Sequence, residues 1–181
     1  MTKQFQLKIF LILLILLILD LIAIKFTTVP ATSPMMQHHL EKVLKTPIQM
    51  IDRVAYDNKQ YLTYLNDRTH HLDLAIYHPN QILQHRYNLE EIYEVSPNAL
   101  ISGCQYYQTS STLVVWGKNK NLSAKILLVT IGNEVFIKNL SNSPYFLTVY
   151  PNEKLNNFSI EFLDSNDHNI TPDFFNVKIP Y

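Results

Sequence analysis

The sequence has little of the material from which most enzyme and nucleotide sites are built. Its 181 residues include one cysteine and three glycines. Cys104 has no second cysteine to pair with, so packing rather than disulfide bonds must stabilise the fold. The glycines at positions 103, 117 and 132 lie too far apart to form a phosphate-binding loop or a dinucleotide fingerprint. We therefore expect no nucleotide ligand and no bound cofactor.

Charge of one sign is not in excess either. Fifteen lysine and arginine residues balance fifteen aspartate and glutamate residues, so the formal net charge at pH 7 is zero. A neutral chain has no long-range field with which to attract the phosphates of a nucleic acid. The balance predicts that nucleic acid is not a partner.

One long apolar run is present, over residues 9–24, and Asp20 is its only polar residue. A helix that crosses a bilayer needs roughly 20 mainly apolar residues, and extension of the run to residue 29 supplies them. On an insertion scale, about 14 strongly apolar residues outweigh the single aspartate. We predict a transmembrane anchor over residues 9–29.

The charges around the run predict its orientation. Lys3 and Lys8 precede it, whereas Lys25 alone follows it closely. Because positive charges favour the cytoplasmic side of a membrane, we expect residues 1–8 in the cytoplasm and the rest of the chain outside the cell membrane. A cleaved secretory signal is the alternative, since Val-Pro-Ala at residues 29–31 resembles a cleavage site.

Asp20 is a candidate contact inside the run. An ionisable group within a bilayer usually faces a partner or a water-filled path, which would make Asp20 a contact for another membrane helix. The same side chain can instead approach the outer headgroups beside Lys25. Both interpretations stay open at this point.

Residues 30–97 are expected to form a linker and a mixed, partly helical region. Ser33 followed by Pro34 is typical of a helix start, and the apolar residues after it keep helical spacing. These signals predict a helix over about residues 34–45. Alternation of apolar and polar residues predicts a strand over residues 72–77.

Two other segments of this region are harder to interpret. The capping box that begins at Thr46 predicts a second helix, and apolar residues as far as Leu65 keep helical spacing. Strand-favouring residues on both sides of the polar residues 57–59 favour the alternative, a helix to about residue 56 followed by a hairpin-like pair. Between residues 79 and 96 the apolar residues again keep helical spacing, which predicts a helix there.

From residue 98 onward the hydrophobic period changes to two, which is typical of strands. The clearest unit is a hairpin in which Gly132-Asn133 joins two apolar strands. About seven strands are expected, over residues 99–107, 112–117, 125–131, 134–140, 145–150, 158–162 and 175–179. The pattern predicts an antiparallel β-sandwich over residues 98–181, and an α+β fold for the whole chain.

The interval from Cys104 to Trp116 is similar to the cysteine-to-tryptophan interval of immunoglobulin domains. The second cysteine of that family's pattern is absent. The resemblance covers residues 98–181 at most, and it implies an immunoglobulin-like architecture without assigning any functional residue.

The sequence contains histidines and one cysteine, which can serve in metal binding or catalysis, but their positions do not match the spacing of known metal or catalytic motifs. The histidine pairs at 38–39 and 70–71 lack the i, i+4 spacing with an interposed glutamate that zinc hydrolases need, so we expect solvated histidines. Cys104 lies between Ile101 and Tyr106 and is expected to be a small buried hydrophobe rather than a nucleophile. We predict no catalytic residue, no metal ligand and no enzymatic activity.

Two aromatic pairs are the candidate binding residues outside the apolar run. They are Tyr106 with Tyr107, and Phe174 with Phe175. Exposed aromatic side chains contribute much contact energy per residue, but in a strand one member of each pair must face inward. The other member is then a binding residue or simply an aromatic residue at the edge of a sheet.

Together these features predict a membrane-anchored, extracytoplasmic binding or assembly module that contacts a protein or a cell-surface polymer. The alternative is a secreted β-sandwich protein, an adhesin or inhibitor-like factor, from which the apolar segment has been cleaved.

Overall fold

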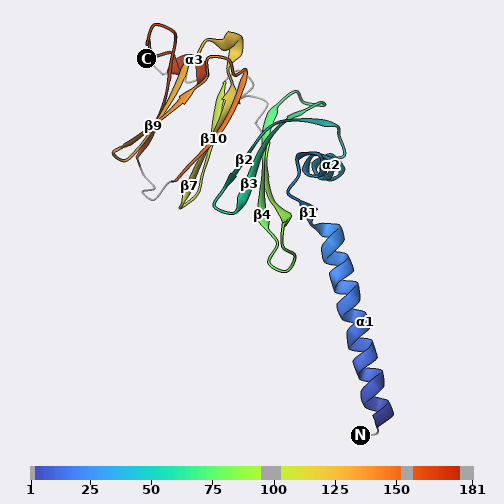
Figure 1. Ribbon diagram of the computed structural model, residues 1–181. Coiled ribbons are helices and arrows are strands. Elements are labelled where there is room, and N and C mark those ends of the chain that lie inside the picture. The colour runs from blue at the N-terminus through green and yellow to red at the C-terminus, as the bar shows by residue number, and fades with distance from the viewer. Residues whose placement is uncertain (1–2, 95–102, 152–156, 176–181) are drawn as a thin grey trace, which may run out of the picture.

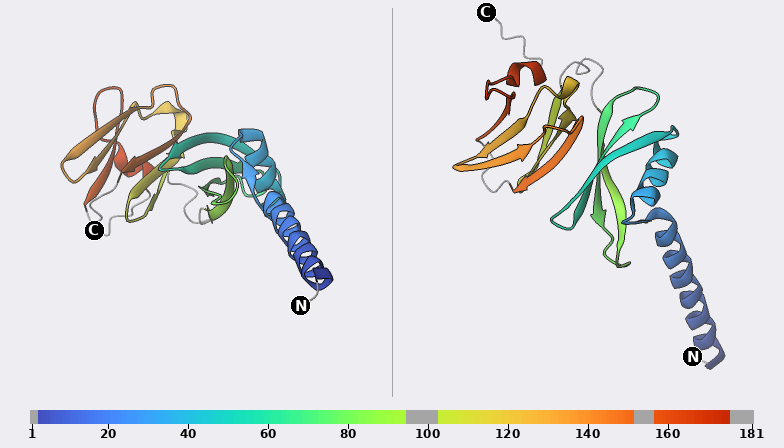
Figure 2. Two further views of the ribbon diagram at one scale, coloured as in Figure 1. Left: turned by 60° about the horizontal axis from the view of Figure 1, so that its bottom comes forward. Right: turned by 45° about the horizontal axis from the view of Figure 1, so that its top comes forward.

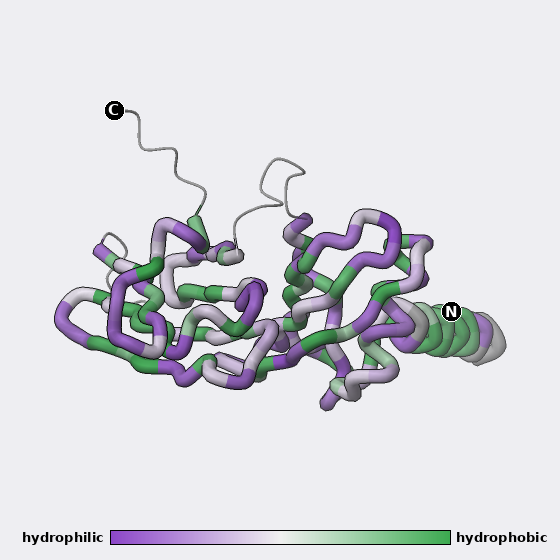
Figure 3. Tube along the Cα trace, turned by 90° about the horizontal axis from the view of Figure 1, so that it is seen from above, coloured by the Kyte–Doolittle hydropathy of each residue, from purple (hydrophilic) through white to green (hydrophobic). Residues whose placement is uncertain are grey.

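The computed structural model describes residues 3–94, 103–151 and 157–175, and places a long helix beside a body of stacked β-sheets (Figure 1). Helix α1 (Lys3–Thr27) projects away from this body. Every large apolar side chain from Ile9 to Ile22 is exposed, so the exposed apolar surface runs around the whole helix. Figure 3 shows hydrophobic residues along much of the trace of this helix. Within the described residues, no helix is both long enough and apolar enough to cross a membrane.

A five-stranded antiparallel sheet, which we call sheet A, follows α1 and has the strand order β1-β5-β4-β3-β2. Its strands are β1 (Val29–Pro30), β2 (Ile48–Tyr56), β3 (Lys59–Asn66), β4 (Leu72–Pro79) and β5 (Arg86–Tyr93). Helix α2 (Ser33–Leu44) lies against one face of the sheet (Figure 2). The helix predicted over residues 34–45 and the strand predicted over residues 72–77 are confirmed.

The helix predicted to begin at the Thr46 capping box is wrong in both alternatives, because residues 48–56 form strand β2. The hairpin-like pair around the polar residues 57–59 is found. Strand β2 pairs with β3 through a turn in which Asp57 and Asn58 have φ of 48° and 60°. Aspartate and asparagine tolerate this left-handed region better than most residues, which suits a tight hairpin turn. A register shift between Met50 and Asp52 leaves Ile51 as the extra residue. Ile51 lies three residues after Ile48, which in the sequence resembles a helical spacing.

The helix predicted between residues 79 and 96 is also wrong, because the segment forms strand β5 after a turn. The register of β5 on β4 shifts at Ile76 and Tyr77, whose partners are Glu91 and Leu89. Glu90 is therefore the extra residue of a bulge. Because of the bulge, Leu89 and Ile92 face the same core although they are three residues apart, which is a helical spacing.

Two three-stranded antiparallel sheets form the rest of the described body. Sheet B has the order β10-β7-β6 and sheet C has the order β11-β8-β9. Their strands are β6 (Cys104–Gln108), β7 (Thr112–Lys118), β8 (Ile126–Ile131), β9 (Glu134–Asn139), β10 (Tyr145–Pro151) and β11 (Phe158–Leu163). A 3-10 turn, η2 (Lys120–Leu122), precedes β8, and a short helix, α3 (Thr171–Phe174), follows β11. The β-rich fold predicted from the sequence is confirmed.

The hairpin predicted at Gly132-Asn133 is confirmed as the connection between β8 and β9. Gly132 has a φ of 60°, a value that glycine adopts without steric cost. The strand predicted over residues 175–179 lies almost wholly outside the described residues. The boundary predicted at residues 97 and 98 also lies outside them.

Sheets A, B and C stack as layers (Figure 2). Side chains that alternate along the strands fill the spaces between them. On one face of sheet A, Leu62 and Tyr77 pack against Met36 and Leu40 of α2. The opposite face carries Leu74 and Ile76, which pack with residues of sheet B. A third core lies between sheets B and C and includes Phe146 and Phe162.

Trp116 lies in the core between sheets A and B. Its indole nitrogen donates a hydrogen bond to the carbonyl oxygen of Leu72 at 3.1 Å. Cys104 lies in the core between sheets B and C instead, on the opposite face of sheet B. The cysteine and tryptophan of an immunoglobulin domain share one core. The similarity in spacing therefore does not extend to the packing of these two residues.

Candidate functional site

The pair Tyr106-Tyr107 in β6 is split between two environments. The side chain of Tyr107 faces β5, where its ring lies 4.6 Å from the ring of Tyr93 and its hydroxyl donates to Glu91 at 3.2 Å. Burial, with the charge of Glu91 as a second cause, raises the pKa of Tyr107. Tyr106 is 51% exposed and contacts the ring of Phe158 edge-on, so it is the accessible member of the pair.

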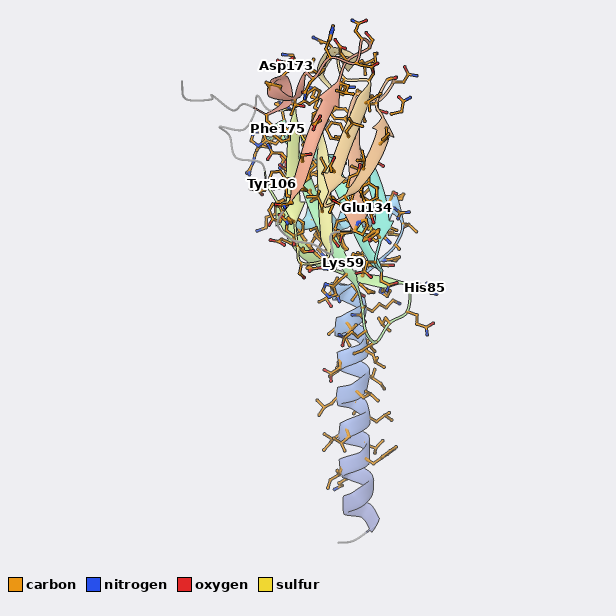
Figure 4. All side chains as sticks on the ribbon, turned by 90° about the vertical axis from the view of Figure 1, so that its left-hand side faces the viewer. Lys59, His85, Tyr106, Glu134, Asp173 and Phe175 are labelled. Atoms are coloured by element: carbon orange, nitrogen blue, oxygen red, sulfur yellow. The ribbon has the colours of Figure 1, made fainter. Side chains whose placement is uncertain are left out.

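The pair Phe174-Phe175 closes the core between sheets B and C. The ring of Phe174 stacks on Phe162 at 3.9 Å between centroids and is 3% exposed. Phe175 is partly buried and packs against the same core. Figure 4 shows Phe175 and Tyr106 along one side of sheets B and C, and Glu134 on the other side. Phe174 therefore serves packing, and the predicted binding role stays a prediction for Tyr106 and Phe175.

Asp20 lies on the exposed shaft of α1, among apolar side chains. Lys25 follows five residues later, which corresponds to about 7.5 Å along the helix axis. Asp20 is thus near the body end of the apolar run rather than at its centre. Its predicted contact with another membrane helix stays a prediction.

The histidines occupy separate places in the described structure. His39 hydrogen bonds to the hydroxyl of Tyr77 at 2.9 Å, and burial, with Lys42 as a second cause, lowers its pKa. His38 lies on the surface, 3.9 Å from Glu41. Across the described residues, no three side chains of the metal-ligating types come together.

Cys104 is 1% exposed, and burial raises the pKa of its thiol. Because the thiolate is the reactive form, a buried thiol with a raised pKa is a poor nucleophile. We expect the folded protein to resist alkylation by a maleimide, and the urea-unfolded protein to take up one label per chain, as measured by mass. Rapid labelling of Cys104 in the native protein would contradict its placement in the core.

An open groove of about 680 Å³ lies between α2 and β2. Its lining includes Gln37, Glu41, Asp52 and Arg53. These polar groups already have partners within the chain. The amide of Gln37 donates to Glu41 and to the carbonyl oxygen of Ile48, and Arg53 donates to the carbonyl oxygen of Ala31 at 2.7 Å. These hydrogen bonds tie α2 and the chain before it to sheet A.

The segment from Lys25 to Ala31, which we call the neck, joins α1 to the body. Arg86 of β5 donates to the hydroxyl of Thr28 at 2.6 Å, to the carbonyl oxygen of Lys25 at 2.7 Å, and to the carbonyl oxygen of Thr28. Thr28 and Val29 are buried, and β1 pairs with β5. The neck is therefore part of the folded body rather than a free linker.

Removing the Arg86 guanidinium should loosen the neck. We expect Arg86→Ala to lower the free energy of unfolding by about 2 kcal/mol, because hydrogen bonds to a charged group contribute about 1.5–3 kcal/mol. Arg86→Lys keeps the charge but loses the forked geometry, so it should restore only part of the stability. Limited proteolysis of the neck provides the measurement. Equal cleavage rates in all three proteins would contradict this role for Arg86.

Strand β9 carries an apolar surface that sequence reasoning missed. Val135 and Ile137 are 58% and 71% exposed, and β9 ends sheet C. Lys138 points inward, where its ammonium donates to the carbonyl oxygen of Leu147 at 2.7 Å. Burial lowers the pKa of Lys138, and the nearby charge of Asp52 opposes this effect. Alternation predicted the strand but carried no signal that it would lie at an edge.

Comparisons with models of protein families, with curated proteins and with solved structures gave no match. The function must accordingly be argued from the surfaces described above. Two of them are apolar: the shaft of α1, and Val135 with Ile137 at the edge of sheet C.

Proposed function

We propose that this protein is a membrane-attached, extracytoplasmic binding or assembly module without catalytic activity, which contacts a protein or a cell-surface polymer. The observation that carries the proposal is α1, a helix with apolar side chains exposed on every side, which projects from a folded β body (Figure 1). A helix that is apolar all round requires an apolar surrounding, either protein or lipid. Among the described residues, the body supplies none along the shaft, because α1 projects away from it (Figure 1).

The length of the apolar run sets how the helix would sit in a bilayer. Residues 9–24 extend about 24 Å at 1.5 Å per residue, whereas the hydrocarbon core is about 30 Å thick. Lys8 and Lys25 flank the run, and their long side chains can reach the headgroups while the bilayer thins locally. Asp20, near one end of the run, would lie close to the same interface.

The neck favours a retained helix over the secreted alternative. Cleavage after Ala31 would remove β1 from sheet A and Val29 from the core beneath α2. It would also take away the three acceptor groups that Arg86 binds. A signal peptide is removed without loss to the mature fold, so these contacts support an anchor that stays attached.

The features of the β-sheets support a binding role rather than a catalytic one. Cys104 is buried, and the histidines do not converge on one another. Two of the exposed apolar side chains of the body, Val135 and Ile137, lie on an edge strand, where a partner can add contacts. A β module held at a membrane and carrying such an edge is suited to recognition or assembly.

Extraction of membranes with alkaline carbonate tests the proposal. The full chain should stay in the membrane pellet, and sequencing of the purified protein should find residues before Thr32. A mature N-terminus at Thr32, with the protein in the medium, would support the secreted alternative. Recovery of intact protein in the soluble fraction would overturn both.

A further inference from the structure

The turn between β4 and β5, over residues 80–85, lies beside the body end of α1. Arg86 follows the turn directly, and its guanidinium donates to the carbonyl oxygen of Lys25 at 2.7 Å and to the hydroxyl of Thr28 at 2.6 Å. These bonds hold the base of the turn at the point where α1 joins the body. In Figures 1 and 4 the turn extends from the body toward the side of α1 and reaches past the body end of that helix.

The tip of the turn is apolar and exposed. Ile82 is 63% exposed, and Leu83 beside it is partly exposed. Residues 80–89 include His85 and Arg86 but no aspartate or glutamate. A tip of this kind is suited to the boundary of a bilayer, because it offers apolar area and brings no carboxylate toward the lipid phosphates.

The backbone of the turn is hydrogen bonded within the chain. The side-chain oxygen of Asn80 accepts the N–H groups of Ile82 and Leu83 at 2.9 and 2.8 Å. The N–H of Asn80 donates to the carbonyl oxygen of Arg86, and the N–H of Arg86 donates to the carbonyl oxygen of Leu83. Unpaired backbone groups are costly to remove from water. Because these groups are paired, the tip can enter a less polar layer without that cost.

The proposed position of α1 sets the depth of the turn. With residues 9–24 in the hydrocarbon core, Lys25 lies at the outer boundary of the core, together with the guanidinium that binds its carbonyl oxygen. Each headgroup layer is roughly 5–8 Å thick, since a bilayer measures about 40–45 Å in total and its core about 30 Å. A turn that reaches past the body end of α1 therefore enters the headgroup layer.

We propose that the β4–β5 turn binds the lipid headgroup layer of the membrane in which α1 is anchored, with Ile82 and Leu83 among the headgroups. The inference rests on the proposed membrane attachment and adds a second contact to it. One helix alone leaves the tilt of the body to the bilayer, whereas two contacts joined through Arg86 fix it. Sheets B and C, at the end of the body away from α1, are then held clear of the membrane and open to a partner (Figure 1).

Quenching by spin-labelled lipids tests the contact. Full-length Ile82→Cys is labelled with a nitrobenzoxadiazole fluorophore and reconstituted into phosphatidylcholine vesicles, some of whose lipids carry a nitroxide on the headgroup. The buried Cys104 gives little background. The nitroxide should quench this probe several-fold more strongly than the same probe at Asp173→Cys, which lies at the opposite end of the body (Figure 4). The headgroup layer is hydrated, so a water-soluble reagent still reaches an unlabelled thiol at position 82.

A matched pair of variants tests the apolar tip. The probe is moved to Gln84→Cys, an exposed position in the same turn. Ile82→Asp should then lower the quenching to the level of the probe at position 173, because phosphates repel the new carboxylate and its transfer from water is costly. Ile82→Leu keeps the apolar area and should leave the quenching unchanged.

The possible failures are distinguishable. Equal quenching at positions 82 and 173, in protein that carbonate leaves in the membrane pellet, would overturn the headgroup contact while the anchor stands. A probe at position 82 that is shielded from water but not quenched by the labelled lipids would mean that a protein covers the turn, which also overturns the inference. Release of the whole chain by carbonate would overturn the membrane proposal, and this inference with it.

Discussion

Replacing Leu14 and Leu17 together by lysine is expected to release the chain from membranes. Both side chains lie near the middle of the apolar run of α1 and are exposed. A lysine at the centre of an inserted helix costs about 3 kcal/mol and the lost leucine about 0.5 kcal/mol, so the double change opposes insertion by about 7 kcal/mol. Carbonate extraction of the two proteins side by side measures the effect. The wild-type chain should pellet and the variant should not.

A matched control separates the helix from the body. Ile82→Lys introduces the same charge at an apolar side chain that is 63% exposed in the body. This control should pellet like the wild-type chain. If the double variant also remained in the pellet, the attachment would have to lie outside α1.

Gly117→Ala is expected to destabilise the protein by disrupting the close packing of β6 against β7. A Cβ atom at this position would lie 1.9 Å from the carbonyl oxygen of Gly103 and 2.6 Å from the ring of Phe146. The Gly103 oxygen also accepts the backbone N–H of Lys118 at 2.6 Å, so it cannot move away without breaking that bond. Overpacking of a core costs about 1–3 kcal/mol and sometimes more, and we expect the upper end here.

Thermal unfolding followed by circular dichroism measures this loss. A cost of about 3 kcal/mol corresponds to a drop in Tm of about 6–12 °C for a protein of this size. Ser111→Ala, on the exposed turn between β6 and β7, serves as the control and should change Tm little. A Gly117→Ala protein as stable as the control would mean that β6 and β7 do not approach as described.

The strands after residue 98 could be predicted because successive residues face the core and the opposite side of the sheet in turn. In β8, Leu127, Val129 and Ile131 point into the core, and the residues between them face the other side. The Gly132-Asn133 turn then fixes the hairpin register. A period of two and a turn with a defined backbone conformation are local properties, so the sequence alone carries them.

The strands of sheet A were harder to predict because bulges disturb the period. In β5, the extra residue Glu90 changes a spacing of two into a spacing of three, and in β2 the extra residue Ile51 lies three residues after Ile48. That spacing is the signal of a helix. A bulge is decided by pairing with a neighbouring strand, and such pairing is not visible in one segment of sequence.

The candidate surfaces also differ in whether a local stretch of sequence is enough to recognise them. The apolar run of α1 is visible in the sequence, because nothing distant is needed to recognise it. The aromatic pairs were candidates by residue type, but Tyr107 and Phe174 are occupied by neighbours from β5 and β11. The exposure of Val135 and Ile137 depends on β9 being the last strand of sheet C, which only the topology reveals.

Labelling of a cysteine from outside the cell tests the central claim, that α1 holds the β body at the outer face of a membrane. Ile82→Cys places a thiol on the exposed surface of the body, and the buried Cys104 gives little background. In intact bacterial cells that produce the full chain, a membrane-impermeant maleimide should label this variant without permeabilisation, and the labelled protein should pellet with the membranes. Labelling that appears only after permeabilisation would contradict the account.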